Sequence, residues 1–124
     1  MGLMHVPVIV RAPNQPNSEF PVAYSASFLV DTGAIDSMAP TSALLKAGIQ
    51  AVGSERYELA DGSVREYSFG VAQIEVMGKI TGGRVIFGPE DLEPILGATA
   101  LESAGITIDP SNQTLKQLPA ISLK

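Results

Sequence analysis

The most informative stretch of this sequence is Phe28-Leu29-Val30-Asp31-Thr32-Gly33-Ala34. Its three leading apolar residues predict a short buried strand. A carboxylate and a hydroxyl follow at once, and Gly33 allows close approach of the backbone where the chain must turn. An acid at the end of a rigid strand is well placed for catalysis. The same residues also fit a strand that ends in an Asx-type turn, so both interpretations stay open at this point.

The size and composition of the chain limit what kind of protein it can be. Its 124 residues predict a single domain, residues 1–124, with a substantial core. The net charge is −5 and no basic cluster is present, so nucleic acid is not an expected partner. The chain has no cysteine, which excludes disulfides and thiolate metal sites. We expect neither a metal nor another cofactor.

The chain shows no targeting or membrane segment. The N-terminus lacks a basic region followed by an apolar one, and no apolar run reaches membrane-spanning length. We therefore expect a cytoplasmic protein without a membrane partner. The only histidine, His5, is expected to be an exposed bystander, which argues against a Ser-His-Asp triad. Any chemistry must come from carboxylates.

The hydrophobic pattern predicts a mainly β chain with two short helices. Strands are expected at residues 3–11, 20–27, 28–30, 57–60, 64–67, 71–76, 80–87 (broken at Gly82-Gly83), 94–97, 106–109, 114–118 and 121–123, and helices at 41–47 and 98–104. Gly48 and Gly105 suit the ends of the helices, and Thr99 is a candidate N-cap.

The turn Asp61-Gly62-Ser63 separates two of the expected strands. Asp-Gly between alternating segments is the strongest short-range signal for a hairpin. The tip of this hairpin is small and polar. It fits either a plain surface hairpin or a mobile cover over a site, and the residues alone favour the plain one.

Two segments of the chain are similar to each other. Residues 42–49 and 99–106 share Ala, Leu, Ala, Gly and Ile at a constant offset (99 minus 42 gives 57). The likeness fits a duplicated half-domain, and it also fits two unrelated helices that end in glycine. A duplication would place Asp31-Thr32-Gly33 beside Ile95-Leu96-Gly97.

Together these motifs resemble the retropepsin-like aspartic proteases, and most of all the small bacterial and archaeal members. The resemblance covers residues 22–118 and rests on Leu29-Val30-Asp31-Thr32-Gly33-Ala34, on Leu59-Ala60-Asp61-Gly62-Ser63 and on Ile95-Leu96-Gly97 before the second helix. It implies the fold of a retropepsin-like half-barrel. It also implies that Asp31 is catalytic, with Thr32 and Gly33 completing the catalytic loop and Thr32 bracing the matching loop of a second subunit.

The resemblance further implies how substrate is held. The hairpin of residues 59–64 would be a flap, so that Ala34 of the loop and Ala60, Asp61, Gly62 and Ser63 of the hairpin contact an extended peptide. Metal-free peptide hydrolysis needs one group to activate water and another to protonate the carbonyl oxygen, and two carboxylates that share a proton supply both. Because the chain has one such motif, the second must come from an identical chain.

The expected function is therefore that of an aspartic endopeptidase, active as a homodimer on peptides or proteins. The alternative is a catalytically inactive module of the same fold that serves in dimerisation or peptide binding. This sequence departs from the retroviral members of the family at positions that in those members form dimer contacts and substrate subsites. Ile35 replaces an acid, and Ala98-Thr99 replaces its Arg partner and an Asn, so no unpaired charge remains. Asp36 fits either a residue that lines a substrate subsite or one that faces solvent, and solvent is slightly favoured.

Overall fold

The computed structural model describes residues 4–13, 22–109 and 111–123, and this part of the chain is mainly β with two short helices, as predicted. Its strands are β1 His5–Arg11, β2 Ala23–Val30, β3 Ser37–Pro40, β4 Gly53–Glu58, β5 Val64–Val76, β6 Lys79–Gly88, β7 Ile95–Leu96, β8 Ile106–Asp109 and β9 Thr114–Gln117, and its helices are α1 Thr41–Lys46 and α2 Ala98–Ser103. The first residue of the strand predicted at 3–11, the start of the strand predicted at 20–27, and Pro110 lie outside the described residues.

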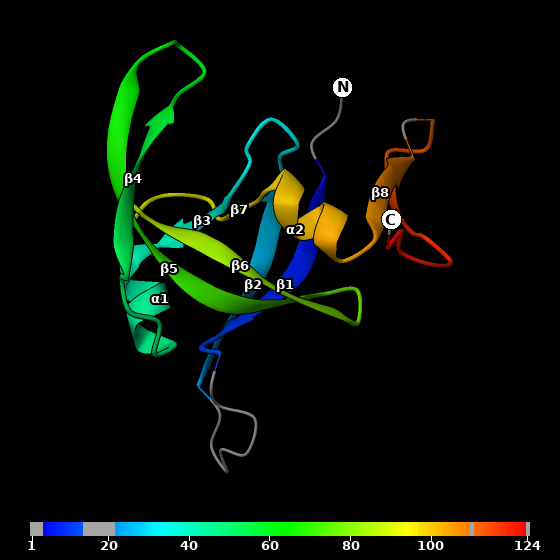
Figure 1. The fold of residues 1–124 in the computed structure, drawn as a ribbon, viewed down its shortest axis with the longest axis horizontal. Helices are drawn as coiled ribbons and strands as arrows, with labels where there is room; N and C mark the ends of the chain where they lie inside the picture. Colours follow the sequence, from blue (N-terminus) through cyan, green and yellow to red (C-terminus); the bar gives the residue numbers. More distant parts are fainter. Residues whose placement is uncertain (1–3, 14–21, 110, 124) are drawn as a thin grey trace.

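Seven strands form one sheet that closes on itself. Their order is β1-β2-β7-β3-β6-β5-β4, and β1 also pairs with β5, so six strands form a ring and β4 extends it at one edge (Figure 1). The long strand β5 makes this possible, because its first half pairs with β4 and its second half pairs with both β1 and β6. Strands β8 and β9 form a separate two-stranded sheet.

The core lies inside this ring of strands. Alternate residues of β1, namely Val6, Val8 and Val10, are buried, as the period of two of a strand with one covered face requires. Leu44 of α1 and Leu101 of α2 belong to the same buried cluster. The two helices therefore cover the barrel rather than forming a layer of their own.

The strand pairing repeats itself at the offset seen in the sequence. Strand β7 pairs in parallel with β2, Leu29 opposite Ile95, and β3 pairs in parallel with β6, Met38 opposite Ile86. Residues 29 and 86 are 57 positions apart, as are 38 and 95, and Met38 itself lies opposite Ile95. The starts of α1 and α2 show the same separation. This is the arrangement that a duplicated half-domain would produce.

Two predictions about the strands were wrong. Strand β5 is continuous through Phe69 and Gly70, and β6 is not broken at Gly82-Gly83. Both glycines pair with β5, and there a Cβ atom would find no neighbour closer than 3.8 Å. The paired backbone thus holds them extended despite the entropic cost of glycine in a strand.

Predictions at the helix starts and the C-terminus also need correction. Thr99 does not cap α2, whose N-cap is Gly97, without a side-chain cap. Residues 121–123 form no strand, and Ile121 packs against Gly105 instead. The predicted glycine ends are confirmed, since Gly48 and Gly105 have φ of 81° and 70°, a region that favours glycine.

Candidate active site

Asp31 directly follows β2 and begins a loop of residues 31–36, here called the Asp31 loop. Its N–H donates to the carbonyl of Leu96 at 3.0 Å, so β7 holds the first residue of the loop in place. Its carboxylate Oδ1 accepts the N–H of Gly33 at 3.0 Å, and its carbonyl accepts the N–H of Ala34 at 3.2 Å. The half-buried acid is therefore both the end of a strand and the centre of an Asx-type turn.

The start of α2 supports the other end of this loop. The N–H groups of Ala98 and Thr99 donate to the carbonyls of Ala34 and Ile35 at 2.8 and 3.1 Å. These loop carbonyls satisfy N–H groups that every helix leaves free at its start, which explains why Thr99 is not needed as a cap. The prediction that Asp31-Thr32-Gly33 lies beside Ile95-Leu96-Gly97 is confirmed (Figure 1).

The buried residue Ser37, which follows the Asp31 loop, connects this loop to Gly97. It is 2% exposed, and its Oγ accepts the N–H of Gly97 at 3.0 Å.

We predict that Ser37→Ala lowers the free energy of unfolding by about 1–3 kcal/mol, because it leaves a buried N–H without an acceptor. Urea unfolding measures the change. Ser25→Ala, the same substitution at an exposed position of β2, is the control and should have almost no effect. Equal losses in both variants would contradict the prediction.

The structure separates the predicted site residues into two groups. Asp31, Thr32, Gly33 and Ala34 lie together in the Asp31 loop, where Thr32 and Gly33 are exposed. Ala60, Asp61, Gly62 and Ser63 lie together in the turn between β4 and β5, all of them exposed. The β4–β5 hairpin projects from the barrel, with its turn at the upper left in Figure 1. In the described part of the chain, no hydrogen bond joins that turn directly to the Asp31 loop.

The turn of the hairpin is stabilised by its own acid. The Oδ1 atom of Asp61 accepts the hydroxyl of Ser63 at 2.6 Å and its N–H at 2.9 Å, and Gly62 has a φ of 86°. These bonds, the hydroxyl first, lower the pKa of Asp61. The stability they contribute is present above the unfolded pKa and is lost as the pH falls through the lowered folded value. The hairpin expected from Asp-Gly is thus confirmed, whereas its role as a flap stays a prediction.

Asp36 does not face solvent freely, which corrects the sequence-based expectation. It is half-buried, and its Oδ2 accepts the hydroxyl of Tyr57 on β4 at 2.7 Å. Burial raises the pKa of Tyr57, the hydrogen bond to Asp36 raises it further, and Arg84 of β6 opposes both. Sequence reasoning missed Tyr57 and Arg84, because nothing in an alternating strand marks which residue meets a distant loop.

Other acids have partners of their own. His5 is exposed, as expected, and its Nε2 contacts the carboxylate of Glu93. The N–H and hydroxyl of Ser42 both donate to Glu90, and these bonds lower the pKa of Glu90. The loop that holds these acids is therefore joined to β1 and α1.

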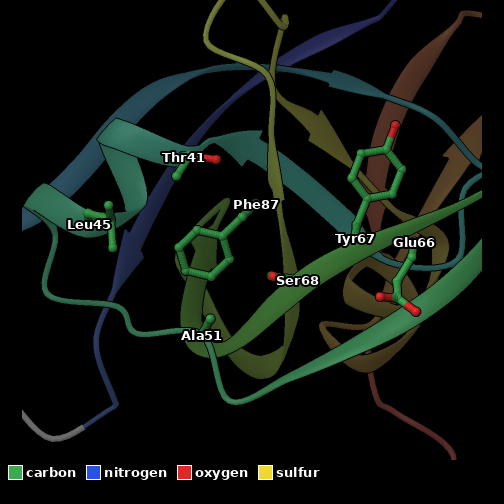
Figure 2. Close-up of a pocket in the computed structure, with 7 residues that line it drawn as sticks. All are labelled: Thr41, Leu45, Ala51, Glu66, Tyr67, Ser68 and Phe87. Carbon is green, nitrogen blue, oxygen red and sulfur yellow. The ribbon is translucent and has the colours of Figure 1, made fainter.

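A hollow of about 400 Å³ lies between α1 and the base of the β4–β5 hairpin (Figure 2). Its lining residues are Thr41, Leu45, Ala51, Glu66, Tyr67, Ser68 and Phe87. None of them belongs to the Asp31 loop or to the turn of the hairpin. The hollow is therefore separate from the predicted catalytic residues.

In residues 4–13, 22–109 and 111–123, no three side chains of the His, Cys, Asp and Glu types come together in a way that could hold a metal ion. Within the same ranges, no helix combines the length and apolar character needed to cross a membrane.

Comparison with known proteins identifies the family. A family model described as aspartyl protease matches residues 21–100, a span that includes the Asp31 loop, the β4–β5 hairpin and the start of α2. No curated protein gave a significant match. The matched span covers well over half of the chain and contains the Asp-Thr-Gly motif on its supported strand end. The chain therefore belongs to the aspartyl protease family.

Proposed function

We propose that this protein is an aspartic endopeptidase that hydrolyses peptide bonds as a homodimer. One observation carries the proposal: a single Asp-Thr-Gly motif holds its carboxylate at the end of β2, where hydrogen bonds from β7 and α2 support the loop on both sides. A site built for positioning an acid fits catalysis better than it fits an ordinary turn, because acid–base chemistry needs the reacting groups held in place.

The mechanism requires Asp31 from each of two subunits. The two carboxylates share one proton, as the pair of catalytic Asp residues does in aspartic proteases generally. The ionised Asp31 accepts a proton from water, which attacks the scissile carbonyl carbon, while the protonated Asp31 donates to the carbonyl oxygen. When the tetrahedral intermediate collapses, the Asp31 that took the proton from water gives it to the leaving nitrogen as the C–N bond breaks, and the other Asp31 takes back a proton from a hydroxyl of the intermediate, so that the pair again shares one proton. In this proposal Thr32, which is exposed in the single chain, faces the partner subunit.

The β4–β5 hairpin is proposed to cover the substrate. Its turn residues are exposed and its backbone groups can bond to an extended peptide, in the way that a strand is added to a sheet edge. Covering the site would exclude bulk water from the two carboxylates, which strengthens their interactions with the reacting groups. Ala34 and residues 60–63 would then lie on opposite sides of the peptide.

We predict that activity depends on dimer formation. Cleavage of fluorogenic peptides from a random library should show a specific activity that falls as the protein is diluted, since a single chain holds half of the acid pair. Sedimentation velocity over the same concentrations should show the dimer giving way to monomer at the same point. A monomer with undiminished activity would contradict the homodimer. A stable dimer without cleavage of any peptide would favour the inactive dimerisation or peptide-binding module.

A further inference from the structure

We propose that Tyr57 is a positioning residue that fastens the β4–β5 hairpin to the Asp31 loop through Asp36. The importance of this bond for catalysis rests on the function proposed above, whereas the bond itself does not. Tyr57 lies near the end of β4, and its hydroxyl donates to Asp36 Oδ2 at 2.7 Å. It thus joins the proposed flap to the loop that carries Asp31.

The outer part of the hairpin has little other support from the sheet. Strand β6 pairs with β5 only from Phe69 onward, and β4 pairs only with β5. Residues 57–67 therefore extend past the barrel (Figure 1). Nearer the base, Arg84 of β6 contacts Glu55 at 3.3 Å and lies 4.3 Å from the centre of the Phe69 ring. That ion pair is exposed and contributes little. The orientation of the outer hairpin therefore depends on the Tyr57 hydroxyl, which bonds to Asp36 and also interacts with Arg84.

The acceptor is firmly held, which makes it a useful anchor. The carbonyl of Ile35, directly before Asp36, accepts the N–H of Thr99, and the backbone of Asp36 packs against Gly97. The donor is held too, because the Tyr57 ring lies 6.3 Å from the Tyr67 ring on the other arm of the hairpin. A bond between two restrained groups loses little entropy on forming. It can therefore fix the distance between hairpin and loop.

The Tyr57 hydroxyl is suited to remain a hydrogen-bond donor to Asp36. Burial and the bond to Asp36 raise its pKa, so the hydroxyl keeps its proton at neutral pH. Phenylalanine at this position would keep the ring contact with Tyr67 and remove the hydroxyl, together with its bond to Asp36 and its interaction with Arg84. Tyr67 provides a matched control, because no hydrogen bond of its hydroxyl is found among the residues that the structure describes.

Paired spin labels test the position of the hairpin directly. The chain has no cysteine, so Val64→Cys at the start of β5 and Ser25→Cys on β2, both exposed, introduce unique labelling sites. Labelled protein is diluted into an excess of unlabelled protein, so that distances within one subunit are measured. Wild type should give a narrow distance distribution. Tyr57→Phe should broaden it and move its maximum to longer distance, whereas Tyr67→Phe should leave it unchanged.

Variants of the acceptor complete the test. Asp36→Ala should shift the label distance as much as Tyr57→Phe does. The double variant should shift it no further, because both substitutions remove the same hydrogen bond between Tyr57 and Asp36. Asp36→Asn keeps an acceptor oxygen and should retain the narrow distribution. An unchanged distribution in Tyr57→Phe, an equal shift in Tyr67→Phe, or additive shifts in the double variant would overturn the proposal.

Kinetics separate this inference from the proposed function. Tyr57→Phe should raise KM roughly ten-fold, the equivalent of one net hydrogen bond, and leave kcat within about two-fold, because substrate must then order a loose hairpin. Tyr67→Phe should change neither value. If wild type cleaves no peptide, the proposed function fails while the label distances still decide whether Tyr57 holds the hairpin. A fall in kcat with unchanged KM would contradict a positioning role.

Discussion

Replacing Asp31 with asparagine is expected to lower peptidase activity by roughly 10²- to 10⁴-fold, the contribution of general acid–base catalysis. Asparagine keeps the shape of the side chain, and its amide oxygen can still accept the N–H of Gly33. It cannot take a proton from water, so both roles of the carboxylate pair are lost. The fluorogenic peptide assay measures the change. Asp91→Asn, the same substitution at an exposed loop acid, should leave activity unchanged.

The stability of the same variant tests whether two Asp31 side chains face each other. Two ionised carboxylates a few ångströms apart repel by on the order of 1 kcal/mol in a well-solvated site, and asparagine removes that repulsion. The dimer of Asp31→Asn should thus be as stable as wild type or more so at neutral pH. A variant that melts markedly earlier than wild type would rule out the facing acids.

Mixing the two proteins offers a sharper version of the experiment. Subunits of wild type and Asp31→Asn should exchange into mixed dimers that contain one carboxylate. Adding the variant in excess should then reduce the activity of a fixed amount of wild type. Activity that is indifferent to the added variant would show that one subunit suffices, and it would contradict the shared site.

Gly97→Ala is expected to have the second largest effect, because it acts on stability and on the site together. A Cβ atom at Gly97 would lie 2.7 Å from the carbonyl carbon and oxygen of Asp36 and 2.8 Å from the oxygen of Ile35. These are backbone atoms and cannot rotate away, so the loop must move. We expect a loss of roughly 3 kcal/mol in the free energy of unfolding, the upper range for overpacking. The displaced loop should also cost about 100-fold in kcat/KM.

Gly83→Ala is the matched control for this substitution. Gly83 lies on β6 of the same barrel, and a Cβ atom there meets nothing within 4 Å. Its free energy of unfolding should stay within about 0.5 kcal/mol of wild type, and its activity should be retained. If Gly97→Ala behaved like Gly83→Ala, the close packing of the loop on α2 would not be needed for the site.

Much of the site was predictable from neighbouring residues. The Asp31 turn, the hairpin around Asp61-Gly62 and the glycine ends of both helices follow from local backbone chemistry, which a few consecutive residues determine. The repeat between residues 42–49 and 99–106 even indicated that two distant loops lie side by side. Local signals suffice where the free energy of a turn or cap depends on adjacent residues.

Other features depended on the tertiary structure. Closure of the barrel by β1 and β5, the unbroken strand at Gly82-Gly83 and the missing cap at Thr99 all arise from partners far along the chain. In each case the hydrogen-bond partner is a backbone group far along the chain. The bond between Tyr57 and Asp36 is of the same kind, since 21 positions separate them. Its formation depends on how the hairpin leaves the barrel, and only the complete packing of the strands determines that direction.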